Sequence, residues 1–145
     1  MTKRDAAGDD SGFTLIELLT IVVIIGMLAS IATSVFFRQR SKAEGATAKT
    51  DLRNAATAEE AQLIEGGAYS TSLAALQANG FRRSPDTQFG VAASTIGYCA
   101  VAGTSGRYYW FDSAAGGVQR ASTAGLTPPT TATGICASTT PTALS

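Results

Sequence analysis

A single acidic side chain lies at the edge of a long apolar run. Glu17 is followed by twenty uncharged residues, 18–37. At about 1.5 Å per helical residue they would cover roughly the 30 Å of a bilayer's hydrocarbon core. An ionised carboxylate at the edge of such a span is disfavoured unless a positive partner neutralises it. Glu17 is therefore predicted to be a functional residue that acts through its charge.

Residue patterns for catalysis or metal binding are sparse. The chain has no histidine and no Gly-x-x-x-x-Gly-Lys phosphate motif, and the adjacent acids Glu59 and Glu60 fall on different helix faces. The acids after residue 65 are Asp86 and Asp112, too few for the oxygen shell of calcium. We therefore expect no enzyme, no metal and no cofactor.

Charge balance also argues against nucleic acid as a partner. The chain has 11 basic and 11 acidic residues, so its bulk charge attracts no polyanion. Arg82, Arg83 and Arg107 could touch phosphates, but isolated surface arginines are generally solvated, which makes DNA a disfavoured partner.

One long helix is expected over residues 13–65. Its first half, 13–37, is hydrophobic on every face and forms the transmembrane or assembly segment. Its second half, 38–65, is amphipathic, because small and apolar residues recur there at helical spacing. Two glycines, 66 and 67, supply a stop signal.

Residues 12–19 (GFTLIELL), with the apolar residues 20–29 after them, resemble the processing site and N-terminal helix of type IV pilins and related pseudopilins. The resemblance implies a cytoplasmic leader, residues 1–12, which prepilin peptidase cuts between Gly12 and Phe13. It implies N-methylation of the new Phe13 amine, and an α+β fold of the type IV pilin kind. Such a fold has a projecting hydrophobic half-helix and an amphipathic half packed on a small antiparallel sheet.

Two other observations leave alternatives open. Residues 30–32 (SIA) form a small-x-small site that a general signal peptidase could cut. Basic residues flank both ends of the span, at positions 3 and 4 and at 38, 40 and 42, so charge counting gives no orientation. The resemblance implies a single-pass protein of the cytoplasmic membrane with a cytoplasmic N-terminus, and an extracellular filament on the cell surface after assembly.

A globular head is expected over residues 66–145. β-Branched and aromatic residues at 95–102 and 107–111, around a glycine-containing turn at 103–106, predict a hairpin, and 118–120 a third strand. Packing of the sheet on the amphipathic half-helix would bury aromatic side chains. Those assigned to the core and sheet faces, rather than to a stacking platform, are Tyr98, Tyr108, Tyr109, Trp110 and Phe111.

Two cysteines, Cys99 and Cys136, are too few for a structural zinc site without histidine. In an exported head a disulfide is expected, and closing this loop would stabilise the fold by about 4 kcal/mol. The bridge would pin residues 121–145, which are mostly small and polar and bury little by themselves. Two buried thiols are the alternative.

The leading functional prediction is a structural subunit of a type IV pilus, in which a neighbour's Phe13 amine neutralises Glu17. Its expected partners are further copies of itself, prepilin peptidase/N-methyltransferase, the inner-membrane pilus assembly machinery, minor pilins, and the membrane before assembly. The alternatives are a minor pilin or adhesin at a filament tip, a generic anchored domain, and a type II secretion pseudopilin. Scarce acids disfavour the pseudopilin, since major pseudopilins typically carry a calcium site near the C-terminus.

Overall fold

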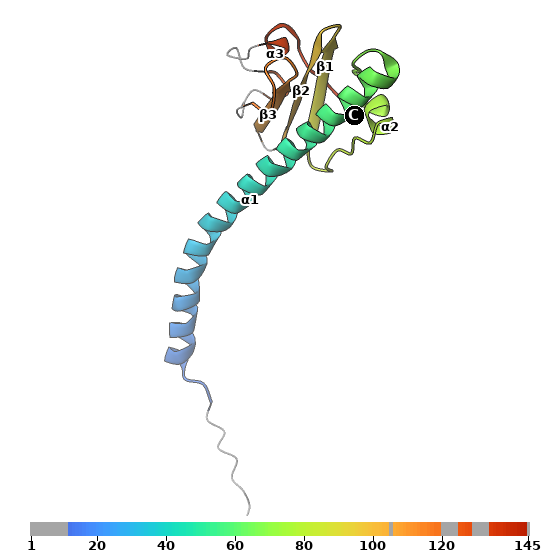
Figure 1. Cartoon of the computed structure of the whole chain (residues 1–145). Coiled ribbons are helices and arrows are strands. Elements are labelled where there is room, and N and C mark those ends of the chain that lie inside the picture. The colour runs from blue at the N-terminus through green and yellow to red at the C-terminus, as the bar shows by residue number, and fades with distance from the viewer. Residues whose placement is uncertain (1–11, 105, 120–124, 129–133, 145) are drawn as a thin grey trace, which may run out of the picture. The chain divides into compact units, whose positions relative to one another are not determined.

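The computed structural model describes residues 12–104, 106–119, 125–128 and 134–144. The chain divides into two compact units, Met1–Gln39 and Arg40–Ser145. In the first, the described residues are mainly the beginning of helix α1 (Leu15–Gly66), which continues into the second. The second unit, the head, also contains α2 (Leu73–Ala78), β1 (Gln88–Ser94), β2 (Gly97–Thr104), β3 (Arg107–Asp112), α3 (Ile135–Ser138) and β4 (Thr142–Ala143) (Figure 1).

The four strands form one antiparallel sheet in the order β3-β2-β1-β4. Seven of the eight residues of β2, the strand between β1 and β3, are buried, because both faces of the sheet are covered. The head's part of α1 crosses one face (Figure 1). The core on this face includes Ala48, Leu52 and Ala55 of α1 with Phe89, Val91, Tyr98, Ala100, Ala102 and Tyr109 of the sheet.

The second face of the sheet is covered by the C-terminal part of the chain. Alternate residues of β2, Cys99 and Val101, point to this face and pack with Tyr108, Trp110, Ile135 and Cys136. The predicted α+β class and helix-on-sheet packing are confirmed. The aromatic side chains are core residues as expected, since all but the partly buried Phe111 are 8% exposed or less.

The sequence-based prediction of the strands was wrong in three places. It missed β1, whose sequence QFGVAAS contains glycine, alanine and serine, residues with little intrinsic preference for strands. The predicted hairpin is shifted: β2 runs on through Gly103 to Thr104, and only positions 105 and 106 separate it from β3. In place of a third strand at 118–120, Val118 makes one isolated bridge to Phe111. Residue 120 lies outside the described residues.

Two buried acids of α1 hold the segment that connects it to the sheet. The Asp51 carboxylate accepts hydrogen bonds from the Ser84 backbone N–H (3.1 Å) and hydroxyl (2.9 Å). The Glu59 carboxylate accepts one from the Ser70 N–H (3.0 Å). These bonds anchor the connecting segment at both ends, because Ser70 precedes α2 and Ser84 follows it.

Candidate functional site

The start of α1 is a capping box built from Thr14 and Glu17. The Thr14 backbone N–H and hydroxyl both donate to Glu17 Oε2, at 2.9 and 2.7 Å, and the Glu17 N–H donates to Thr14 Oγ1 at 3.3 Å. This Thr-x-x-Glu pattern satisfies backbone donors that the helix leaves unpaired in its first turn. The three bonds leave Oε1 of the carboxylate open to a donor from outside the helix.

Gly12 and Phe13 precede this cap, and both are exposed. A Cβ atom at Gly12 would meet no atom within 4 Å, and the Gly12 φ angle is outside the left-handed region. The described fold therefore does not require glycine at this position. A requirement for glycine here would have to come from another protein that recognises the segment.

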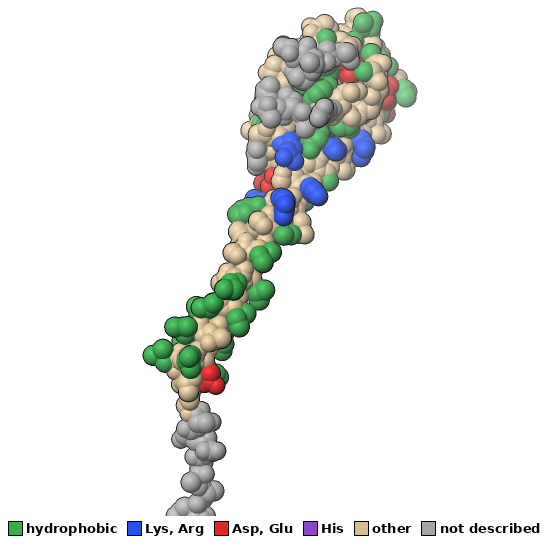
Figure 2. Space-filling view, turned by 90° about the vertical axis from the view of Figure 1, so that its left-hand side faces the viewer, with side chains coloured by type: hydrophobic (Ala, Val, Ile, Leu, Met, Phe, Trp, Pro, Cys, Tyr) green, Lys and Arg blue, Asp and Glu red, His purple; other side chains and the backbone are tan. Residues whose placement is uncertain are grey.

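The helix that follows is apolar on all faces and unburied in the isolated chain. Its most apolar 18-residue window has a mean hydropathy of 2.6 and is not buried at all. The large hydrophobic side chains of residues 13–37 are between 38% (Val35) and 82% (Leu15) exposed. Figure 2 shows them over the visible face of this segment. A surface of this size requires a cover, either lipid or other apolar helices.

Polar side chains inside this apolar segment are satisfied by the helix itself. The hydroxyls of Thr20, Ser30, Thr33 and Ser34 donate to backbone carbonyls three or four residues earlier, at 2.7–3.0 Å. In an apolar environment such bonds remove the cost of burying a free hydroxyl. The helix is unbroken through Ser34 in this structure. Glu17 is thus the sole charged side chain among residues 12–37.

The C-terminal part of the head is fastened by one disulfide and one carboxylate. Cys99 of β2 is bonded to Cys136 of α3, with their Cα atoms 5.0 Å apart. The fully buried Asp112 accepts hydrogen bonds from the N–H groups of Ala114 (2.9 Å), Ala115 (3.0 Å) and Cys136 (2.7 Å). The disulfide and this carboxylate attach α3 to the sheet at neighbouring points, because Cys99 pairs with Asp112 across the β2 and β3 strands.

The remaining candidate residues of the head, two acids and three arginines, have different surroundings. Asp112 is occupied by backbone N–H groups, and Asp86 is exposed. Among the described residues no group of three or more His, Cys, Asp or Glu side chains is placed to hold a metal ion. Arg82 is exposed and Arg83 donates to the Leu144 carbonyl oxygen, whereas Arg107 lies in a groove with other basic residues.

The sequence did not reveal the buried state of Glu59. Its side chain is fully buried, and Oε1 has no hydrogen-bond partner among the described residues. Removal from water raises the pKa of Glu59 to about 7, against the smaller lowering effect of the Ser70 N–H and with a further increase from the neighbouring Glu60 charge. The fold therefore favours the neutral acid.

Stability of the head is expected to fall between about pH 5 and pH 8 because of Glu59. The folded state holds this proton up to a pKa of about 7, whereas the unfolded chain releases it near 4.3, so unfolding becomes easier by about 3 kcal/mol as pH rises through this interval. Glu59→Gln should flatten this dependence and should be the more stable protein at pH 8. Denaturant titrations at pH 5 and pH 8 measure it, with Glu60→Gln as control. Equal slopes with pH for Glu59→Gln and wild type would contradict the assignment.

Comparison with known proteins identifies a matching family profile and relatives of this chain. The sequence matches the family profile described as "Prokaryotic N-terminal methylation motif" over residues 9–33. It is 35% identical over 102 residues to the type IV wide pilus major component PilA4 of Thermus thermophilus, a match that covers 69% of this chain and 78% of that protein.

Two further relatives match shorter parts. The type IV major pilin protein PilA of Myxococcus xanthus is 42% identical over 59 residues, 41% of this chain and 27% of that protein. The type II secretion system core protein G of Pseudomonas aeruginosa is 34% identical over 68 residues, 47% of this chain and 48% of that protein. The fold and the N-terminal motif define a structural subunit of the prepilin type. The chain belongs to the type IV pilin family.

Proposed function

We propose that this chain is a prepilin that is cut between Gly12 and Phe13, methylated on the Phe13 amine, and polymerised through its hydrophobic helix into a type IV pilus. The observation that carries the proposal is the apolar segment of residues 13–37, exposed on all sides, with one carboxylate in its first turn. Lipid covers this segment before assembly, and the same segments of other copies cover it in the filament.

Glu17 would act by pairing with a neighbouring subunit. Before assembly Thr14 satisfies its Oε2 atom, which lowers the cost of holding the acid at the membrane edge. Cleavage creates a positive amine on Phe13. In the filament, a neighbour's amine can approach the open Oε1 atom, so that two charges enter an apolar core as a neutral pair.

The proposed division of the chain follows from this mechanism. Residues 1–12 are the cytoplasmic leader, 13–37 the membrane and assembly segment, 38–65 the part of the helix packed in the head, and 66–145 the rest of the head. Before assembly the subunit is a single-pass protein of the cytoplasmic membrane. Prepilin peptidase, the pilus assembly machinery and minor pilins would act on it there.

A pilus is favoured over a type II secretion pseudopilus by the way in which the C-terminal part is held. The carboxylate oxygens of the buried Asp112 accept hydrogen bonds from three backbone N–H groups, and a disulfide bonds Cys136 to the sheet. Covalent attachment makes a calcium ion unnecessary for ordering this part of the head. The match to a secretion core protein keeps the pseudopilus as the second candidate.

Replacing Gly12 by valine is expected to block maturation. The fold should be unaffected, because a Cβ atom here meets nothing within 4 Å, so the defect would lie in peptidase recognition. Intact-mass measurement should show wild-type protein beginning at Phe13 with added methyl mass, and Gly12→Val at precursor mass. Gly26→Val is the matched control, since a Cβ atom there is also uncrowded, and it should be cut normally. A mature N-terminus at Thr33 would instead support the signal peptidase alternative.

A further inference from the structure

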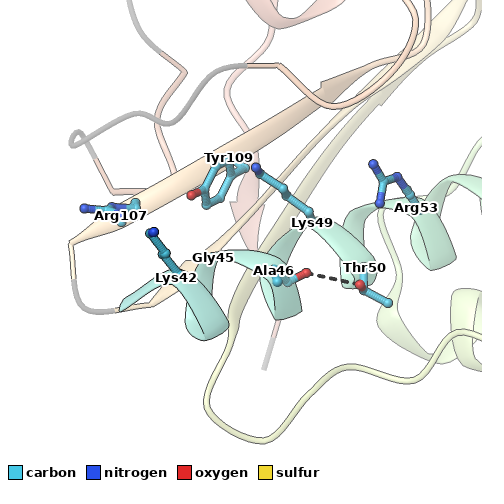
Figure 3. Close-up of a pocket in the computed structure, with 8 residues that line it drawn as sticks. All are labelled: Lys42, Gly45, Ala46, Lys49, Thr50, Arg53, Arg107 and Tyr109. Atoms are coloured by element: carbon cyan, nitrogen blue, oxygen red, sulfur yellow. Dashed lines mark hydrogen bonds between the residues drawn. The ribbon is translucent and has the colours of Figure 1, made fainter. Parts of the chain in front are cut away.

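A basic groove lies between α1 and β3 of the head. It has a volume of about 400 Å³ and is lined by Lys42, Lys49 and Arg53 of α1 and by Arg107 of β3. Figure 3 shows Lys42 and Arg107 on one side of the Tyr109 ring and Lys49 on the other. In the described part of the chain the sole ion pair is Arg40–Glu44, so these four cations have no acidic partner.

The shape of the groove depends on close packing around Tyr109. The Lys49 ammonium lies 4.8 Å from the centroid of this ring, a cation–π contact. A Cβ atom at Gly45 would lie 2.5 Å from the Tyr109 hydroxyl oxygen, so the close approach of ring and helix requires glycine. Tyr109 is 8% exposed, and with Lys49 over its ring it offers no free aromatic face. The groove is therefore a site for negative charge rather than for stacking.

The opposite end of the head is acidic and partly apolar. Glu60 and Glu65 are exposed near the end of α1, and Ile64, one turn after Glu60, is 84% exposed. Ile96, in the turn between β1 and β2, is 80% exposed. Figure 1 shows this turn at the same end of the head as the C-terminal end of α1. We call Glu60, Ile64, Glu65 and Ile96 the acidic end.

Unpaired charge is thus separated along the head's part of α1. Its cations that lack an acidic partner among the described residues, at 42, 49 and 53, all precede residue 54, and its exposed acids, 60 and 65, both follow it. Glu60 accepts a hydrogen bond from the Tyr69 hydroxyl at 3.4 Å, but no described cation pairs with it. The two acids of this part of α1 before residue 54 are engaged, Glu44 with Arg40 and Asp51 with Ser84. Complementary patches at opposite ends of one molecule form head-to-tail contacts that propagate as an open polymer.

We infer that the basic groove binds the acidic end of a second copy of this chain. The inference rests on the proposed filament function. Eleven residues separate Lys49 from Glu60 and 23 separate Lys42 from Glu65, which at 1.5 Å per residue is about 16 to 35 Å. The contact therefore joins subunits whose heads are displaced along the helix axis by about this distance.

A second copy explains more of the surface than a nucleic acid would. The chain without residues 1–12 has nine basic and eight acidic residues, so its net charge of +1 attracts a polyanion only weakly. The acidic end also carries Ile64 and Ile96, and exposed apolar side chains are expected at a protein contact. The groove and the acidic end of the same molecule carry charges of opposite sign.

Charge reversal in the full-length protein tests the inference. Lys42→Glu with Arg53→Glu leaves two acids and two bases in the groove, so its net attraction for the acidic end is lost. The yield of sheared filaments should therefore fall about tenfold or more. Glu60→Lys with Glu65→Lys should do the same. The variant with all four changes places two new acids in the groove and two new bases at the acidic end, so that they can pair again, and it should recover filaments in part. Failure of this combined variant to recover, or normal filaments from either reversed pair, would overturn the inference.

A matched control separates the groove from general charge effects. Arg53→Glu and Arg82→Glu make the same change at two exposed arginines, one in the groove and one outside it. Arg53→Glu alone should lower filament yield. Equal loss from Arg82→Glu would show that net charge rather than the groove matters. Mature mass and membrane amount should be unchanged in both.

Cysteine crosslinking tests the contact directly. Arg53→Cys with Glu65→Cys places two thiols about 18 Å apart along one helix, too far for a disulfide within the chain. Sheared filaments should give a reducible ladder of oligomers on gels, and filaments without a ladder count against the contact.

If the variant with Lys42→Glu and Arg53→Glu keeps its filaments but no longer retains duplex DNA, the groove binds a polyanion and the inference is wrong. If wild type makes no filaments, the proposed function itself fails.

Discussion

Replacing Glu17 by glutamine is expected to abolish filaments while leaving the leader cleaved at a normal level. Glutamine can still occupy the third position of the capping box with Thr14, so the helix start is retained and the charge alone is lost. A neighbour's Phe13 amine would then enter the apolar core without a partner, at a cost of about 3–5 kcal/mol for each contact. A loss of this size is more than a hundredfold in each binding equilibrium.

Intact-mass measurement and electron microscopy together test this result. Mature subunits of Glu17→Gln and Glu17→Ala should accumulate in the membrane, with no filaments in the sheared fraction. Glu44→Gln is the matched control, since it makes the same change elsewhere in α1, at a partly exposed glutamate paired with Arg40, and should assemble normally. Normal filament yield from both Glu17 variants would show that the carboxylate does not drive assembly.

Removing the disulfide is expected to produce the largest loss of stability. The bond joins residues 37 positions apart, and constraining a loop of this length stabilises the fold by about 4 kcal/mol in the chain-entropy model. Because 1 kcal/mol corresponds to about 4–8 °C in a small domain, Cys136→Ser should lower the thermal midpoint by roughly 15–30 °C. Calorimetry of the exported protein measures this shift.

Two controls test whether the loss of stability comes from the disulfide. Cys99→Ser alone, and both changes together, should give the same midpoint as Cys136→Ser, because one bond is removed in each case. Limited proteolysis should cut the C-terminal part first, while residues 50–65, which pack against the sheet, stay protected. Two reactive thiols in the natively folded, exported wild-type protein would contradict the bridge.

Local patterns in the sequence were sufficient to predict the helix and its apolar half. Length and composition determine these features, and each depends on neighbours within one or two turns. The cap was not predicted, although the Thr14-x-x-Glu17 spacing is its signal. The cysteine pair was also predictable, since few chemical states are open to two cysteines in an exported domain. The inner strand β1 (Gln88–Ser94) was not predictable, because its glycine and two alanines form a strand only when β2 and β4 supply hydrogen-bond partners.

Tertiary structure alone decided the electrostatic features of the head. Glu59 and Glu60 are adjacent in sequence, yet one is fully buried with a raised pKa and the other is exposed. The groove brings Gly45 and Lys49 against Tyr109, about sixty residues later in the chain. Burial and the pairing of charges depend on residues that are distant in sequence and close in space. The sequence by itself therefore determined the apolar helix through which this chain can assemble. The fold decided which of its charged side chains are exposed for contacts with other subunits.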